Sequence, residues 1–264
     1  MTQTTPERPL ALVTGASSGI GLELAREFAR NGYDLIAVAE SDRLDAAASQ
    51  LEPLGSRVET IHADLATHDG VEAVHDRLAG RSVDAAAINA GVGSGGRFPD
   101  TDLDAELRLV DLNVRSAVHL AKYLTREMTE RGRGRILFTS SIASTHPDAY
   151  EAVYGASKTF LQSFAKALRK ELAGTGVTVT SLMPGPTATD FFRRARMLDT
   201  KIGASDSKDD PAEVARVGFE ALMAGKEQAI PGASNKALTA VARFLPDRAK
   251  AALHAKLGAP GSAR

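Results

Sequence analysis

The chain has 264 residues, no cysteine and a formal net charge of −1 at pH 7. This length is enough for one large domain with a well-buried core. The lack of cysteine excludes disulfide bonds and thiolate-based zinc sites, and we expect no metal site. The nearly balanced charge gives no indication of nucleic-acid binding.

No feature of the sequence divides the chain, so we expect a single domain over residues 1–264. Residues 1–9 are polar, contain two prolines and lack the apolar core of a signal peptide, which favours a flexible start. No apolar run is long enough to cross a bilayer. With the lack of cysteine, these features favour a cytoplasmic protein.

Short apolar runs alternate with helical patterns along most of the chain. This alternation indicates βα units, in which a parallel sheet is covered by helices on both faces. The expected strands are residues 10–13, 33–39, 58–63, 83–88, 135–139, 177–182 and a short last one at 229–232.

The first expected strand leads into three glycines with the spacing Gly-x-x-x-Gly-x-Gly, followed by a helix. Glycines at this spacing permit a tight turn and allow the backbone to approach a pyrophosphate, whose charge faces the first amides of the helix. A simple turn is the alternative, but the place between a strand and a helix favours dinucleotide binding. The cofactor-binding residues expected here are Gly15, Ser17, Ser18, Gly19, Ile20 and Gly21.

Polar and small residues follow the next three strands. Glu40 is placed to accept hydrogen bonds from a ribose diol, which favours NAD over NADP, although it can also be a solvated charge. Asp64 either contacts the adenine or caps the following helix. The small residues after the fourth strand let the backbone touch a cofactor, or form a structural turn. The cofactor-binding residues expected here are Glu40, Asp64, Leu65, Asn89, Ala90 and Gly91.

Tyr154 and Lys158 are four residues apart and share one face of an expected helix. An ammonium group close to a phenol favours the phenolate, so we expect Lys158 to lower the pKa of Tyr154. Ser141 follows the fifth strand, thirteen residues before Tyr154, and a returning loop brings its hydroxyl beside the phenol. An ordinary helix and cap are the alternative. His146 offers the only support for a Ser-His-Asp hydrolase.

A helix is expected over residues 104–131, and its Asn113 either holds a water near the chemistry or is simply tolerated. Apolar residues occupy more than one face of this helix and of the helix after Tyr154, which predicts a homodimer or homotetramer through these two helices. The stripe expected to face the core or a partner is Leu107, Val110, Val114, Val118 and Ala121. The residues outside a single stripe are Leu109, Leu112, Phe160, Leu161, Phe164 and Leu168.

The loop after the sixth strand contains Pro184 and Gly185 in a rigid turn. Thr187 and Thr189 are expected to bind a carboxamide or phosphates, or to satisfy the loop backbone. Residues 191–210 mix apolar and charged side chains, as a substrate lid does. Residues 236–264 form a basic amphipathic tail that covers a substrate cleft or a partner, touches an anionic membrane, or packs as a solvated helix on its own domain.

Together these motifs resemble the short-chain dehydrogenase/reductase family over residues 10–190. They are the glycine loop, Asn89-Ala90-Gly91, Ser141 with Tyr154-x-x-x-Lys158, and Pro184-Gly185. The resemblance implies a doubly wound sheet of about seven strands. It makes Tyr154 the acid/base and Ser141 the group that orients the carbonyl. It further implies that Lys158 binds the nicotinamide ribose and that Asn113 holds a proton-relay water.

This sequence departs from the family at the end of the second strand. Members that use NAD usually carry an aspartate at the position of Ala39, and members that use NADP often carry an arginine at the position of Glu40. We therefore expect an oxidoreductase that uses NAD or NADP, with NAD favoured, and moves hydride between nicotinamide and a secondary alcohol or ketone carbon. The alternatives are a non-catalytic dinucleotide-binding sensor or scaffold, and a lipid-modifying reductase docked on a membrane by its tail.

Overall fold

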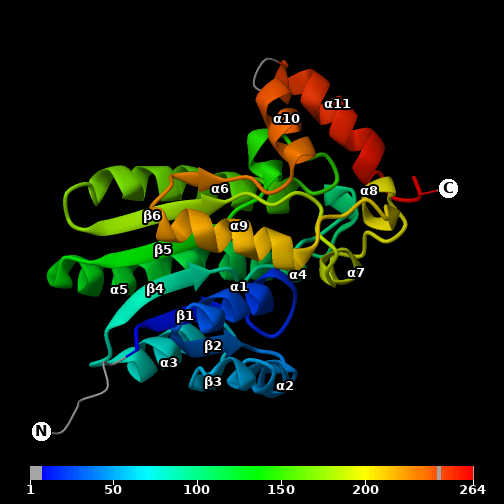
Figure 1. Ribbon diagram of the computed structural model, residues 1–264. Coiled ribbons are helices and arrows are strands. Elements are labelled where there is room, and N and C mark those ends of the chain that lie inside the picture. Colours follow the sequence, from blue (N-terminus) through cyan, green and yellow to red (C-terminus); the bar gives the residue numbers. More distant parts are fainter. Residues whose placement is uncertain (1–7, 243–244, 264) are drawn as a thin grey trace, which may run out of the picture.

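The computed structural model describes residues 8–242 and 245–263, and its centre is a seven-stranded sheet in which every pair of neighbouring strands is parallel (Figure 1). The strand order is β3-β2-β1-β4-β5-β6-β7, which confirms the predicted doubly wound α/β fold. The strands are β1 (Leu10–Thr14), β2 (Asp34–Ala39), β3 (Val58–His62), β4 (Val83–Ile88), β5 (Gly134–Thr139), β6 (Val177–Leu182) and β7 (Gln228–Ala229).

The last strand is shorter and earlier than expected. β7 ends at Ala229, whereas the sequence indicated residues 229–232. Pro231 has no N–H to donate to a neighbouring strand, and Gly232 has a φ of 77°, so the chain turns away from the sheet at this point.

Helices cover both faces of the sheet because successive side chains of each strand point to opposite sides. Leu12 belongs to the core on one face, with α3 (His68–Leu78), α5 (Ser116–Arg131) and α6 (Ala152–Glu171). Ala11 and Val13 belong to the core on the other face, with α1 (Gly19–Arg30), α2 (Leu44–Ser49) and α9 (Pro211–Met223). The chain therefore has two apolar layers, one on each side of the sheet.

The helix expected over 104–131 is divided into three parts. α4 (Leu103–Val110) passes into a π-helical turn, η3 (Asp111–Arg115), and then into α5. Asn113 lies in this turn and is 1% exposed. Single π-turns inside α-helices are frequent at functional sites because they redirect one side chain.

The π-turn changes which residues of this region share a face, so the stripe expected to face the core or a partner is not buried as one unit. Leu107 and Val110 are exposed, whereas Leu109 is fully buried. Leu112, which we assigned to a possible subunit interface, packs against the core and lines the central cavity.

The carboxyl ends of the strands lie at one edge, and the strand order reverses between β1 and β4, where open α/β sheets form their ligand crevices. Figure 1 shows four later helices gathered at this end: α7 (Phe191–Arg194), α8 (Lys201–Ala204), α10 (Ala233–Ala242) and α11 (Asp247–Gly258). The short 3-10 segments are η1 (Glu52–Leu54), η2 (Phe98–Asp100) and η4 (Ile142–Thr145).

The expected lid, residues 191–210, contains α7 and α8 and has a small apolar cluster of its own around Phe192 and Met197. The predicted basic tail forms α10 and α11. Among the residues that the structure describes, none of the helices has the length and apolar character needed to span a bilayer. Residues 1–7 of the expected flexible start lie outside the described residues.

Candidate active site

A cavity of about 1040 Å³ opens at the carboxyl ends of the strands. It extends from the glycine loop, past Tyr154, to α11. Every residue predicted to bind the cofactor lines it, and so does Ser141. Asn113 is the exception among the predicted site residues, since it lies buried behind the cavity wall.

The glycine loop has the geometry that a phosphate-binding turn requires. Gly15 has a φ of 69°, and its amide donates to the carbonyl oxygen of Val38 over 2.8 Å. A Cβ added to Gly21 would lie 2.1 Å from the carbonyl oxygen of Gly15, so the start of α1 packs against the loop only with glycine here. The residues present therefore fit a dinucleotide whose pyrophosphate faces the first amides of α1.

Asn89 ties three strand ends together. Its side-chain amide donates to the carbonyl oxygen of Thr14 over 3.0 Å, and its side-chain oxygen accepts from the hydroxyl of Thr139 over 3.0 Å. Of the two roles considered for this turn, the side chain thus has the structural one. Residues 89–91 all line the cavity.

Arg108 connects the two carboxylates expected at the adenosine end. Its guanidinium donates to Glu40 and to Asp64, each over 2.9 Å. Burial raises the pKa of Asp64, but hydrogen bonds from Arg108 and from the Ala66 amide outweigh it and hold this pKa below its usual value. Asp64 does not cap the next helix, because Thr67 accepts the hydrogen bond from the Gly70 amide.

Two further arginines lie at this end of the cavity, and neither was among the predicted site residues. Arg43 pairs with Asp190 at 3.1 Å, and Arg194 donates to the Ser18 hydroxyl over 2.9 Å. The three arginines lie far along the chain from their partners. The separation is 44 residues for Arg108 and Asp64, 147 for Arg43 and Asp190, and 176 for Arg194 and Ser18. Local spacing holds no signal of such contacts.

Tyr154 and Lys158 lie on one face of α6, as expected. The Nζ atom of Lys158 is 5.7 Å from the centre of the Tyr154 ring. It donates a hydrogen bond to the carbonyl oxygen of Thr139 over 2.9 Å. Lys158 is 5% exposed, and burial lowers its pKa to about 8.

The pKa of Tyr154 does not move in the direction expected from Lys158 alone. Burial raises it, and the nearby carboxyl groups of Glu151 and Asp148 act in the same direction. A hydrogen bond with Ser141 opposes them. Without cofactor, the apolar surroundings of the phenol therefore outweigh the lysine, because a buried phenolate loses its solvation.

Within the described part of the chain, Ser141 has no histidine beside it that would complete a hydrolase triad. Its Oγ accepts from the Ala143 amide over 3.1 Å. His146 is directed elsewhere, with Nδ1 at 3.2 Å from the Thr145 hydroxyl and Nε2 at 2.9 Å from Asp148. This arrangement argues against Ser-His-Asp chemistry.

The Asn113 side chain is fully engaged within the protein. Its Nδ2 donates to the Val92 carbonyl over 2.9 Å and to the Ser157 hydroxyl over 3.0 Å. Its Oδ1 accepts from the Val92 amide over 2.9 Å. Asn113 therefore joins the loop after β4 to α6, where its partner Ser157 directly precedes Lys158.

Apolar side chains contribute to the remaining wall of the cavity. The Phe191 ring lies 5.1 Å from the Tyr154 ring. Four leucines of the tail line the cavity and keep 40–49% of their surface exposed: Leu238, Leu245, Leu253 and Leu257. The tail thus borders the cavity, which is one of the roles considered for it.

Thr187 and Thr189 bind the loop itself. The Thr187 hydroxyl donates to the Gly185 carbonyl over 2.9 Å, and the Thr189 hydroxyl accepts from the Phe191 amide over 3.3 Å. The Thr189 methyl group also packs over Gly19, where an added Cβ would lie 2.9 Å from it. This loop therefore lies directly against the glycine loop.

Residues 9–198 match the family model of short chain dehydrogenases. The chain belongs to the short-chain dehydrogenase family. Like its relatives, it is an oxidoreductase that acts on alcohol or carbonyl groups, with a Rossmann-type NAD(P)-binding fold. The resemblance derived from the motifs is confirmed.

Similar proteins include members from several bacteria. An uncharacterized short-chain type dehydrogenase/reductase of Sinorhizobium fredii is 36% identical over 190 residues, which are 70% of this chain and 73% of the relative. A short-chain dehydrogenase of Sphingobium yanoikuyae, solved with NADPH, has a TM-score of 0.80 at 28% identity and covers 90% of this chain and 96% of its own.

The bulky-bulky ketone specific alcohol dehydrogenase of Comamonas testosteroni has a TM-score of 0.76 at 28% identity. It covers 90% of this chain and 95% of its own.

Proposed function

We propose that this short-chain dehydrogenase interconverts a secondary alcohol and a ketone with NAD(P), and that Tyr154 is its acid/base. The observation that carries the proposal is the convergence of Tyr154, Ser141 and Lys158 on one cavity that also contains the glycine loop. When bound, the nicotinamide supplies or accepts the hydride.

Each of the three side chains has a distinct role. In the reducing direction, the Tyr154 hydroxyl donates a proton to the carbonyl oxygen, and in the oxidising direction the phenolate accepts it. The Ser141 hydroxyl, which lines the same cavity as Tyr154, orients the same oxygen. Lys158 binds the nicotinamide ribose with its ammonium group and favours the phenolate once the site is filled.

The cofactor preference depends on the charges at the end of β2. Glu40 faces the cavity as a carboxylate where a 2′-phosphate would be repelled and a diol would find an acceptor. Arg108 neutralises part of this charge but is shared with Asp64. We therefore infer a preference for NAD.

The substrate class follows from the wall opposite the glycine loop. The four exposed leucines of the tail, together with Phe191, contribute apolar surface to the cavity that contains Tyr154. Apolar side chains left partly exposed around a cavity favour an apolar ligand that covers them. The substrate proposed is a ketone or alcohol with bulky apolar groups on both sides of the reacting carbon.

A substrate panel with purified protein tests the proposal. Ketones and secondary alcohols of graded size are offered with NADH, NADPH, NAD or NADP, and turnover is followed at the nicotinamide absorbance. Turnover that increases with the size of the apolar groups supports the proposal. A protein that binds NAD(P) but turns over no member of the panel would instead be the sensor or scaffold considered from the sequence.

The exposed leucines of the tail also favour the second candidate function, a lipid-modifying reductase that docks on an anionic membrane. Sedimentation with vesicles that contain phosphatidylserine distinguishes the two. Wild type that stays in the supernatant while turning over soluble ketones contradicts membrane docking.

A further inference from the structure

Two histidines and one aspartate converge beside the active site, and the proposed chemistry uses none of them. His146 and Asp148 lie on the loop between η4 and α6, and His254 lies on α11. The Nε2 atoms of His146 and His254 are 2.9 and 3.3 Å from Asp148 Oδ1. The Asp148 side chain is completely buried.

The Asp148 carboxylate accepts no hydrogen bond within the described residues, although both rings touch it. A buried carboxylate without partners is costly, since it has lost the water that would solvate it. A cation held between these atoms would account for short contacts that lack hydrogen-bond geometry.

The hydrogen bonds on the far sides of the two rings show which nitrogens carry protons. His254 Nδ1 lies 3.2 Å from the Ala149 carbonyl oxygen, which only accepts, so Nδ1 is the protonated nitrogen. The Thr145 hydroxyl donates its proton to the Ile142 carbonyl over 2.7 Å, so its oxygen accepts from His146 Nδ1 at 3.2 Å. In the neutral rings, both Nε2 lone pairs are then directed at a carboxylate.

Lone pairs and a carboxylate repel one another unless a cation lies between them. Metal-binding histidines commonly donate their second ring N–H to a backbone or side-chain oxygen, as both rings do here. A tetrahedral zinc ion with bonds of about 2.0–2.1 Å separates its ligand atoms by roughly 3.4 Å, close to the two contacts measured. Glu151 Oε2, at 3.8 Å from His254 Nε2, is placed as a fourth ligand.

We propose that His146, Asp148 and His254 bind a divalent transition-metal ion, Zn²⁺ in the first place, with Glu151 or water as the fourth ligand. Imidazole and carboxylate ligands suit this ion. The proposal departs from the expectation that the chain has no metal site. Residue spacing in the sequence did not indicate this cluster, because His254 lies more than a hundred residues from its partners.

The ion would join α11 to the loop that leads into the Tyr154 helix. Leu253 and Leu257 flank the site on α11 and line the cavity, as His146, Glu151 and His254 do. Metal binding would therefore hold this wall of the substrate cavity in place. The role is structural, and it is independent of whether the proposed reaction is correct.

A second cluster, His68, Glu72 and His119, has to be separated from the first in any experiment. Its Glu72 carboxylate already accepts a hydrogen bond from the Tyr123 hydroxyl over 2.8 Å, and His68 is 57% exposed. The double variant His68→Gln/His119→Gln provides the background in which the proposed site is measured. The matched variant carries His146→Gln and His254→Gln.

The test uses tag-free, chelator-treated protein in calorimetric titrations with Zn²⁺ and absorbance titrations with Co²⁺. The His68→Gln/His119→Gln protein should bind about one equivalent of Zn²⁺, show the intense visible bands of tetrahedral Co²⁺, and melt at a higher temperature with Zn²⁺. Adding His146→Gln and His254→Gln should abolish all three effects, while Thr145→Val should weaken binding about 10- to 100-fold.

Absence of Zn²⁺ uptake at micromolar concentration by the His68→Gln/His119→Gln protein overturns the proposal. So does binding that is unchanged when His146 and His254 are replaced. Circular dichroism and NAD(P) binding show whether each variant is folded, and Thr145→Val provides the test if the histidine variants are not.

Discussion

The Nζ atom of Lys158 donates a hydrogen bond to the carbonyl oxygen of Thr139 over 2.9 Å. This bond anchors the buried end of the lysine at the end of β5, where the cofactor cavity begins. The ammonium group is thus held near the phenol of Tyr154 but is not hydrogen-bonded to it. Burial of the Lys158 ammonium group makes the free energy of unfolding depend on pH.

The pKa of Lys158 is lowered from 10.5 to about 8 by burial. Between these values the unfolded chain holds a proton on this lysine that the cofactor-free folded chain has released. The contribution of Lys158 to the free energy of unfolding therefore increases with pH in this window and is constant below it. Urea unfolding of wild type and Lys158→Met at about pH 7.5 and about pH 9.5 measures this. Lys158→Met should exceed wild type in free energy of unfolding by less at the higher pH. A difference that is the same at both pH values contradicts the lowered pKa.

Tyr154→Phe should lower turnover about 10²- to 10⁴-fold, because it removes the proton that reaches the substrate oxygen and keeps the ring. Cofactor affinity should stay nearly unchanged. Steady-state kinetics and cofactor titration measure the two effects separately. Tyr33→Phe is the control, since Tyr33 lies outside the cavity. Activity of Tyr154→Phe close to that of wild type would falsify the assignment.

Glu40→Arg should move cofactor preference toward NADP by at least about tenfold, since an arginine there attracts a 2′-phosphate and a carboxylate repels it. Arg108→Gln should act in the opposite direction, because it leaves Glu40 and Asp64 without their shared cation. Binding of both cofactors to the three proteins checks this. Tighter NADP binding by wild type than by Glu40→Arg would exclude the proposed role of Glu40.

Asn113→Ala should lower the free energy of unfolding by about 1–3 kcal/mol for each buried group that it leaves without a partner. Val92 loses two hydrogen bonds and Ser157 loses one. Asn31→Ala is the control, since the side chain of Asn31 makes one exposed bond. Urea unfolding compares them. If Asn113→Ala has slow turnover but unchanged stability, the result favours a role of Asn113 in holding a relay water over a role in joining the loop after β4 to α6.

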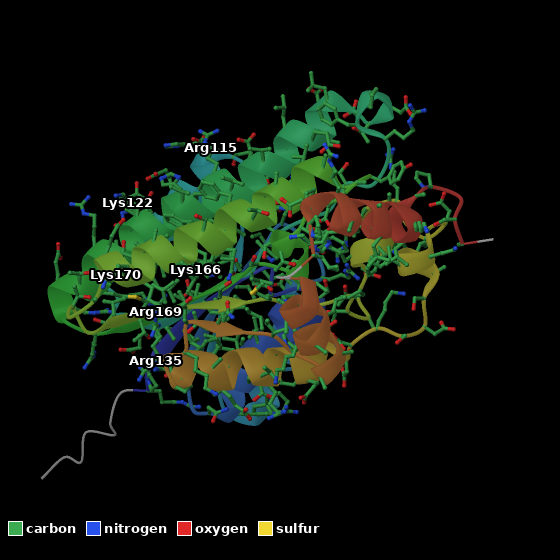
Figure 2. The ribbon with its side chains drawn as sticks, turned by 90° about the horizontal axis from the view of Figure 1, so that it is seen from above. Arg115, Lys122, Arg135, Lys166, Arg169 and Lys170 are labelled. Carbon is green, nitrogen blue, oxygen red and sulfur yellow. The ribbon has the colours of Figure 1, made fainter. Side chains whose placement is uncertain are left out.

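The predicted homodimer or homotetramer should form through the exposed apolar residues of α4 and α6. Leu107 and Phe160 are 53% and 41% exposed, so Phe160→Glu is the interface test. Figure 2 shows Arg115, Lys122, Lys166 and Lys170 along the same region, and all four are exposed. Because two copies would bring these charges together, dimerisation should strengthen with added salt.

Light scattering at micromolar concentration checks the assembly. Wild type should have the mass of a dimer or tetramer and Phe160→Glu that of a monomer. Leu238→Glu, at an exposed position on α10, should not change the mass. A monomeric wild type at high salt rejects the prediction.

Local sequence was sufficient for most of the fold and for predicting which residues line the candidate cavity. The glycine spacing between β1 and α1, and the four-residue spacing of Tyr154 and Lys158, define their geometry within one turn or one helix face. Parallel strands end at one edge of the sheet, so Glu40, Asn89 and Ser141 had to meet there. The spacing of residues along one helix or strand can be read from the sequence without knowing which surface the element packs against.

The tertiary structure alone decided how these groups are paired and solvated. Arg108 reaches Glu40 from 68 residues away, and His254 reaches Asp148 from the far end of the chain. Burial raised the pKa of Tyr154 although a lysine lies one helical turn away. Ion pairs and desolvation depend on which distant side chains the packing brings together, and no spacing along the chain encodes that.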